Sequence, residues 1–115
     1  DATRILVGKW SWQPDIERAL AKEQSGKSRT GTLEIRADGS YINRREGVIQ
    51  FLGDGTYVSR KEKKAPQRGE WNVEKVDGKL VYRNTLAGGL SLVIPLTIID
   101  EDNFRLTSVQ YTRID

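Results

Sequence analysis

Two arginines occupy the same position in two copies of a short sequence repeat. Residues 33–46 (LEIRADGSYINRRE) and 49–62 (IQFLGDGTYVSRKE) align so that Arg44 falls on Arg60. A guanidinium is permanently charged and presents a fork of N–H donors that fits a carboxylate. If both side chains pointed into a barrel, they could orient the acidic head group of a bound molecule.

Strand register decides where these two arginines point. Asp-Gly is a strong signal for a two-residue hairpin turn. Such a turn pairs Ile35 with Ile42 and Phe51 with Val58, and it leaves both arginines at the end of one apolar face. We expect Ile42, Val58, Phe51 and Trp71 to form the apolar walls of this ligand site. Two alternatives stay open, namely that the arginines lie at a solvated rim or that a one-residue bulge turns them outward.

The same register places Tyr41 and Tyr57 on the opposite, exposed face of the hairpins. The densest basic run follows directly and contributes Lys61, Lys63 and Lys64. These five residues form a candidate interaction surface for an acidic protein or an acidic lipid. Cross-strand packing of tyrosines and protection of a strand edge by lysines explain the same residues without any partner. No nucleic-acid-binding motif accompanies the charge, so a nucleic-acid partner is not expected.

The residue inventory excludes much enzyme chemistry. The chain of 115 residues has no histidine and no cysteine. It therefore has no Ser-His-Asp triad, no thiol nucleophile, no disulfide and no zinc site of the common nitrogen and sulfur type. The acidic residues Asp100, Glu101 and Asp102 have the composition of a turn, and their spacing matches no EF-hand loop. We expect no enzyme activity, no cofactor and no bound metal.

The spacing of apolar residues predicts one all-β domain over residues 1–115. Hydrophobic residues make up 37% of the chain, which suffices for a small barrel whose strands each give one face to water. From Gly31 onward, alternation with a period of two recurs about every 10–12 residues between Asp-Gly turns. This pattern favours an antiparallel up-and-down meander of about eight or nine strands that closes into a barrel. The expected inner positions are Leu6, Trp10, Leu33, Ile35, Ile42, Phe51, Val58, Trp71, Val73, Leu92, Ile94, Leu96, Phe104 and Leu106.

One short helix is expected between the first two strands. Residues 3–12 alternate as a first strand. Pro14 suits the first turn of a helix, which is expected to run for about three turns. Ser25 and Gly26 then end this helix.

The start of the chain and its apolar runs bear on localisation. The sequence begins at Asp1 rather than at a methionine. This start fits an exported protein, periplasmic or secreted, whose signal peptide has been removed, although an engineered boundary explains it equally well. The longest apolar run, 90–99, is far shorter than the roughly 20 residues of a membrane span. We expect no transmembrane segment.

Several short motifs follow one another in a characteristic order. They are Gly-Lys-Trp at 8–10, the two Asp-Gly-Ser/Thr-Tyr hairpins, Gly-Glu-Trp at 69–71, Asp-Gly-Lys-Leu at 77–80 and IDEDNFRL at 99–106. In this order they resemble the small bacterial lipocalin-like domains over nearly the whole chain. The resemblance implies an up-and-down barrel of about eight strands, usually in exported proteins. The chain departs from this family in its early helix and in a strand count near nine.

Two functions are compatible with this pattern. The first is a non-enzymatic binding protein that holds a small apolar or amphiphilic ligand in the barrel mouth. The alternative is a filled barrel that acts as a protein–protein or cell-envelope interaction module through its basic hairpin edge. An open or a filled barrel interior distinguishes the two.

Overall fold

Strands make up most of the computed structural model, which describes residues 2–115. Asp1, where the sequence suggests a processed end, lies outside the described residues. The elements in chain order are α1 (Ala2–Leu6), β1 (Gly8–Pro14), α2 (Ile16–Ala21), β2 (Ser25–Ile35), β3 (Ser40–Leu52), β4 (Tyr57–Lys61), β5 (Gln67–Val76), β6 (Lys79–Leu86), β7 (Ser91–Asp100), β8 (Asn103–Leu106) and β9 (Val109–Arg113).

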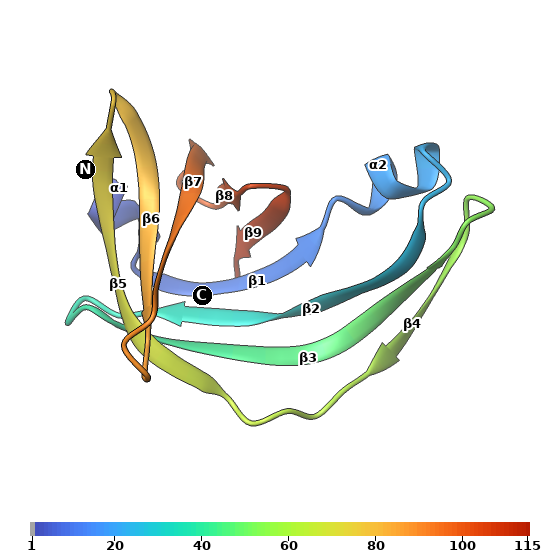
Figure 1. The fold of residues 1–115 in the computed structure, drawn as a ribbon, viewed down its shortest axis with the longest axis horizontal. Coiled ribbons are helices and arrows are strands. Elements are labelled where there is room, and N and C mark those ends of the chain that lie inside the picture. The colour runs from blue at the N-terminus through green and yellow to red at the C-terminus, as the bar shows by residue number, and fades with distance from the viewer. Residues whose placement is uncertain (1) are drawn as a thin grey trace.

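Antiparallel pairing joins eight of these strands into a closed barrel (Figure 1). Their order is β2-β1-β9-β8-β7-β6-β5-β3, and β3 pairs back with β2. The long strand β3 has two successive partners on its other side: β5 pairs with its first half, and β4 with its second half. The prediction of an up-and-down antiparallel barrel with a short helix after the first strand is confirmed.

The N-terminal segment departs from the predicted first strand. Residues 3–12 do not form one strand, because Ala2–Leu6 form α1 and β1 begins only at Gly8. Leu6 is fully buried, and its carbonyl accepts a hydrogen bond of 2.9 Å from the indole Nε1 of Trp10. A run of five residues is too short for its periodicity to separate helix from strand. Packing of Leu6 into the barrel core decides the matter.

The second helix is shorter than predicted. Pro14 is the last residue of β1 rather than part of the helix. Asp15 is the N-cap, and its side chain accepts a hydrogen bond of 3.1 Å from the backbone N–H of Arg18. The helix ends at Ala21, shortly before Glu23 takes a positive φ of 51°. An Asp cap satisfies one of the free N–H groups of the first turn, so it fixes where the helix begins.

Aromatic and aliphatic side chains fill the barrel interior. The Trp10 and Phe104 rings meet edge to face at 4.5 Å, and Phe104 stacks on Tyr111, also at 4.5 Å. Trp71 and Tyr82 stack at 6.3 Å. The buried core consists of Leu6, Trp10, Leu33, Ile35, Tyr41, Trp71, Tyr82, Leu96, Phe104 and Leu106.

Most of the expected inner positions belong to this core. Val73 and Ile94 are partly buried and pack against it. The prediction is wrong for Leu92 and Val58, which are 43% and 55% exposed. Phe51 is buried in a separate cluster beneath α2, formed with Ala19 and Ile49. Ile42 is buried but belongs to neither cluster.

The first two hairpins have three-residue loops rather than the predicted two-residue turns. In the first hairpin the N–H of Arg36 donates to the Ser40 carbonyl (3.0 Å), and only Gly39 in the loop takes a positive φ, of 91°. The pairing is therefore Ile35 with Tyr41. The second hairpin has the same form, in which the N–H of Leu52 donates to the Thr56 carbonyl.

A side-chain contact explains the longer loops. Asp38 accepts hydrogen bonds from the N–H and the hydroxyl of Ser40, and Asp54 does the same for Thr56. In the third hairpin Lys79 follows the Asp-Gly pair and offers no hydroxyl. That turn has the predicted two residues, both with positive φ, and it pairs Val76 with Lys79. All three turns therefore contain Asp-Gly, and the residue after the glycine distinguishes them. Serine or threonine there accompanies a three-residue loop, and lysine accompanies a two-residue turn.

A β-bulge divides β3 into two parts that pack against different partners. Thr30 pairs with Gly47 and Gly31 with Arg45, so Glu46 has no partner on β2. An extra residue of this kind shifts the alternation of the strand. Tyr41 before the bulge therefore packs in the barrel core, whereas Phe51 after it packs beneath α2.

Two tyrosines, Tyr82 in the core and Tyr111 packed against it, should make the fold sensitive to alkali. Burial, with smaller contributions from Tyr111 and Tyr41, raises the pKa of Tyr82, and burial raises the pKa of Tyr111 to about 12. An unfolded chain loses these protons near pH 10, before the folded chain does. Stability is thus retained below about pH 10 and falls as the pH rises toward 12, by about 1.4 kcal/mol per pH unit for each tyrosine.

Urea unfolding at a series of alkaline pH values measures this dependence. Tyr82→Phe should flatten it, whereas the matched variant Tyr57→Phe, at an exposed position, should leave it unchanged. An equal slope in the wild type and in Tyr82→Phe would contradict the prediction.

Candidate interaction surface

The residues expected to bind a small ligand lie in separate environments. Trp71 is in the barrel core and Phe51 is in the cluster beneath α2. Arg44 is exposed and pairs with Thr32 on β2. Arg60 is exposed as well and pairs with Val48 rather than with Ile49. The expected register is wrong by one residue, and a slip of one residue exchanges the two faces of a strand.

None of the five depressions described on residues 2–115 is lined by a buried residue of the barrel core. One of them, with a volume of about 230 Å³, does bring Val58 and Arg60 together beside Lys27, Val48 and Gln50. The six expected ligand-binding residues therefore do not share a site.

Tyr41 is wrongly placed on the expected interaction surface, because only 2% of it is exposed. Its hydroxyl lies over Gly69, where an added Cβ would come within 2.8 Å of it. Burial raises the pKa of Tyr41, and the neighbouring Asn84 side chain partly opposes this shift. The longer hairpin loop is again the cause, since it turns Tyr41 toward the same face as Ile35.

The remaining residues of that surface lie together on β4 and the segment after it. Tyr57 is 41% exposed, and Lys61, Lys63 and Lys64 are exposed. All five residues of β4 are exposed, and β3 is its single strand neighbour. β4 lies outside the closed ring of eight strands, and its second edge is free.

Positive charge is concentrated in the part of the chain that contains β4. Residues 44–68 hold seven basic and three acidic side chains, while the whole chain has a net charge of +3. We call the seven cations the basic edge: Arg44, Arg45, Arg60, Lys61, Lys63, Lys64 and Arg68.

Few of these cations are neutralised. Glu62 forms ion pairs with Lys64 (3.6 Å) and with Arg29 of β2 (3.4 Å). Glu46 accepts a hydrogen bond from Thr32. Within residues 2–115, Lys64 is the one member of the basic edge that has an ion pair. The other six present unpaired positive charge to solvent.

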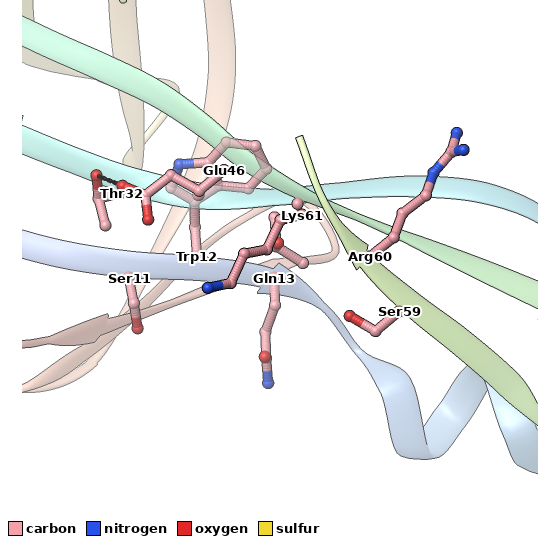
Figure 2. Close-up of a pocket in the computed structure, with 11 residues that line it drawn as sticks. Ser11, Trp12, Gln13, Thr32, Glu46, Ser59, Arg60 and Lys61 are labelled. Carbon is pink, nitrogen blue, oxygen red and sulfur yellow. Dashed lines mark hydrogen bonds between the residues drawn. The ribbon is translucent and has the colours of Figure 1, made fainter. Parts of the chain in front are cut away.

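A polar groove runs beside β4 and was not expected from the sequence. It has a volume of about 530 Å³ and lies across the four neighbouring strands β1 to β4. Thr32 donates a 2.9 Å hydrogen bond to Glu46 within it, while Lys61 extends into the groove and Arg60 points away (Figure 2). The lining residues are Ser11, Trp12, Gln13, Thr30, Gly31, Thr32, Glu46, Gly47, Ser59, Arg60 and Lys61.

A sequence signal for this groove exists, but it depends on register. Ser11 and Gln13 alternate with Trp12 on β1, and Thr30 and Thr32 alternate on β2. Only the pairing of Ser11 with Thr32 places these polar residues side by side.

Comparisons with protein-family models, curated proteins and solved structures give no match for this chain. The lipocalin-like resemblance therefore stays a prediction, and the function has to be argued from the geometry. Neither helix in residues 2–115 has the length and apolar character needed to cross a membrane.

Proposed function

We propose that this chain is a non-enzymatic binding domain whose filled barrel presents the basic edge to an acidic segment of a partner protein. The observation that carries the proposal is that Arg60 and Lys61, neither of which has an ion pair, lie on β4, the strand with a free edge, and that Lys63 and Lys64 follow it directly. Charge complementarity of this kind steers association and selects the partner.

Apolar side chains on the same strand favour a protein partner over a nucleic acid or a lipid surface. Tyr57 and Val58 are 41% and 55% exposed, and Ser59 alone separates them from Arg60 and Lys61. A polyanion bound through its phosphates would use the cations alone. An acidic protein segment with neighbouring apolar residues would use both halves of the strand.

The small-ligand function is the less supported of the two. It requires an apolar cavity that the arginines can reach, whereas the barrel interior is packed with aromatic rings and both arginines are exposed. We therefore place the interaction function first.

Charge reversal on β4 tests the proposal. A short fluorescein-labelled peptide rich in glutamate should bind the wild-type chain, and binding should weaken as salt is added. Arg60→Glu combined with Lys61→Glu should weaken it about tenfold or more, because attraction is replaced by repulsion at two sites. Fluorescence anisotropy measures both effects.

The matched control carries the same change of charge elsewhere. Lys75→Glu combined with Lys79→Glu alters two exposed lysines at the β5–β6 hairpin. An equal loss of affinity in this control would contradict a local site. Tighter binding of duplex DNA or of anionic vesicles would contradict a protein partner. An apolar fluorescent probe that binds and is displaced by fatty acids would support the small-ligand function instead.

A further inference from the structure

We infer that the acidic partner segment binds by adding an antiparallel strand to the free edge of β4. This inference rests on the proposed function and specifies how the partner is held. Among the strands of residues 2–115, β4 alone has one strand neighbour, so one of its edges is free along its whole length. The other strands have two or more neighbours, although β2, β5 and β7 meet one of theirs over only part of their length.

The hydrogen-bond ladder shows which backbone groups face the open edge. At one end of the β3–β4 pair the N–H of Leu52 donates to the Thr56 carbonyl, and at the other end the N–H of Glu62 donates to the Glu46 carbonyl, both at 3.0 Å. Antiparallel strands alternate between bonded and non-bonded residue pairs. Counting inward from both ends assigns Val58 and Arg60 to the bonded pairs.

The alternation directs the backbone groups of three β4 residues toward the free edge. The N–H and C=O groups of Tyr57, Ser59 and Lys61 face the free edge, and each of these residues pairs with β3 without exchanging hydrogen bonds. Such a row of donors and acceptors is what an extended peptide needs in order to pair with a sheet edge.

Side chains along β4 define the order of residues in the partner. The first residues of an added antiparallel strand lie opposite Lys61 and Arg60, and its last residues lie opposite Val58 and Tyr57. Oppositely charged residues stabilise each other across strands, and so do aromatic and β-branched residues. The preferred segment therefore begins with acidic residues and continues with apolar ones. Lys61 meets it on the groove side, and Arg60 meets it on the other face.

A second copy of this chain fits the edge poorly. Antiparallel pairing of two β4 strands about Ser59 would place Arg60 opposite Val58 and Lys61 opposite Tyr57. No carboxylate would face any of the four cations, Arg60 and Lys61 of each copy. The charge that discourages self-association thus selects an acidic chain.

Two synthetic peptides of equal composition test the inferred order. One reads Asp-Glu-Thr-Val-Tyr and the other Tyr-Val-Thr-Glu-Asp, each with Gly-Ser at both ends. The first should bind the intact chain more tightly, and on binding it should slow hydrogen exchange at the amides of Ser59 and Lys61. Tighter binding of the second would overturn the antiparallel orientation, and unchanged exchange at both amides would overturn strand addition.

A proline on β4 separates strand addition from simple charge attraction. In Ser59→Pro the lost N–H is one that faces the free edge, and proline is tolerated at such positions of edge strands. This variant should bind the first peptide at least tenfold more weakly, whereas Ser59→Ala should bind it as the wild type does. The exchange measurement decides the question on wild-type protein if Ser59→Pro fails to fold.

The outcomes distinguish this inference from the proposed function. Loss of binding in the Arg60→Glu and Lys61→Glu variant, together with unchanged binding in Ser59→Pro, would overturn strand addition and leave the acidic-partner function standing. Absence of any charge-dependent binding would overturn both. Self-association that is abolished by Ser59→Pro would replace the acidic peptide with a second copy.

Discussion

Replacing Trp10 by alanine should lower the free energy of unfolding by about 3–5 kcal/mol. Trp10 is fully buried and meets the Phe104 ring at 4.5 Å. Its indole N–H donates a hydrogen bond to the Leu6 carbonyl, and the guanidinium of Arg113 lies 4.3 Å from the centre of its ring. The substitution therefore removes a large core side chain and the link between β1, α1 and β9. Denaturant titration followed by circular dichroism measures the loss.

Two further variants test this prediction, one at the same position and one at an exposed position that serves as a control. Trp10→Phe keeps an aromatic ring but loses the buried hydrogen bond to Leu6, so its destabilisation should be smaller. Val93→Ala changes an apolar residue that is 49% exposed, and it should have little effect. A Trp10→Ala protein as stable as the Val93→Ala protein would contradict the observed core.

The second large effect is expected at Gly31 of β2, which pairs with Trp12 on β1 and with Arg45 on β3. An added Cβ there would overlap the Arg44 carbonyl oxygen on β3 and lie 2.8 Å from Cζ2 of Trp12 on β1. Gly31 also borders the bulge in the β2–β3 pair. Since backbone cannot move aside as a flexible side chain can, Gly31→Ala should destabilise the fold by about 1–3 kcal/mol.

Gly88 supplies the matched control, because an added Cβ there meets no atom within 4 Å. Gly88→Ala should leave the midpoint of thermal unfolding nearly unchanged, while Gly31→Ala lowers it by several degrees. Equal midpoints for the two variants would show that β2 and β3 are not as closely spaced as described.

The hairpin sequences illustrate how far local patterns lead. Asp38, Asp54 and Asp77 each precede a glycine, and each pair forms a turn between antiparallel strands. The loop length was predicted correctly for the third pair alone. In the other two, the hydroxyl of Ser40 or Thr56 donates a hydrogen bond to the aspartate of the turn, and the loop is one residue longer. The longer loop shifts the strand register by one residue. Tyr41 therefore lies in the core, and Arg44 and Arg60 point away from it.

The remaining differences arise where distant segments meet. Leu6 belongs to a helix because it packs under Trp10, and Phe51 leaves the barrel core because the bulge at Glu46 turns it toward α2. Neither contact has a signal in a short window of sequence. The polar groove likewise depends on the pairing of Ser11 with Thr32 across two strands.

The sequence by itself determined the all-β class, the antiparallel order of strands, most of the core positions and the concentration of positive charge in residues 44–68. These properties follow from composition and from periodicity along single strands. The tertiary structure alone decided the register, the filling of the interior and the identity of β4 as the open edge. The physical reason is that a strand exchanges its faces with a shift of one residue, and turn hydrogen bonds, bulges and barrel closure set that shift.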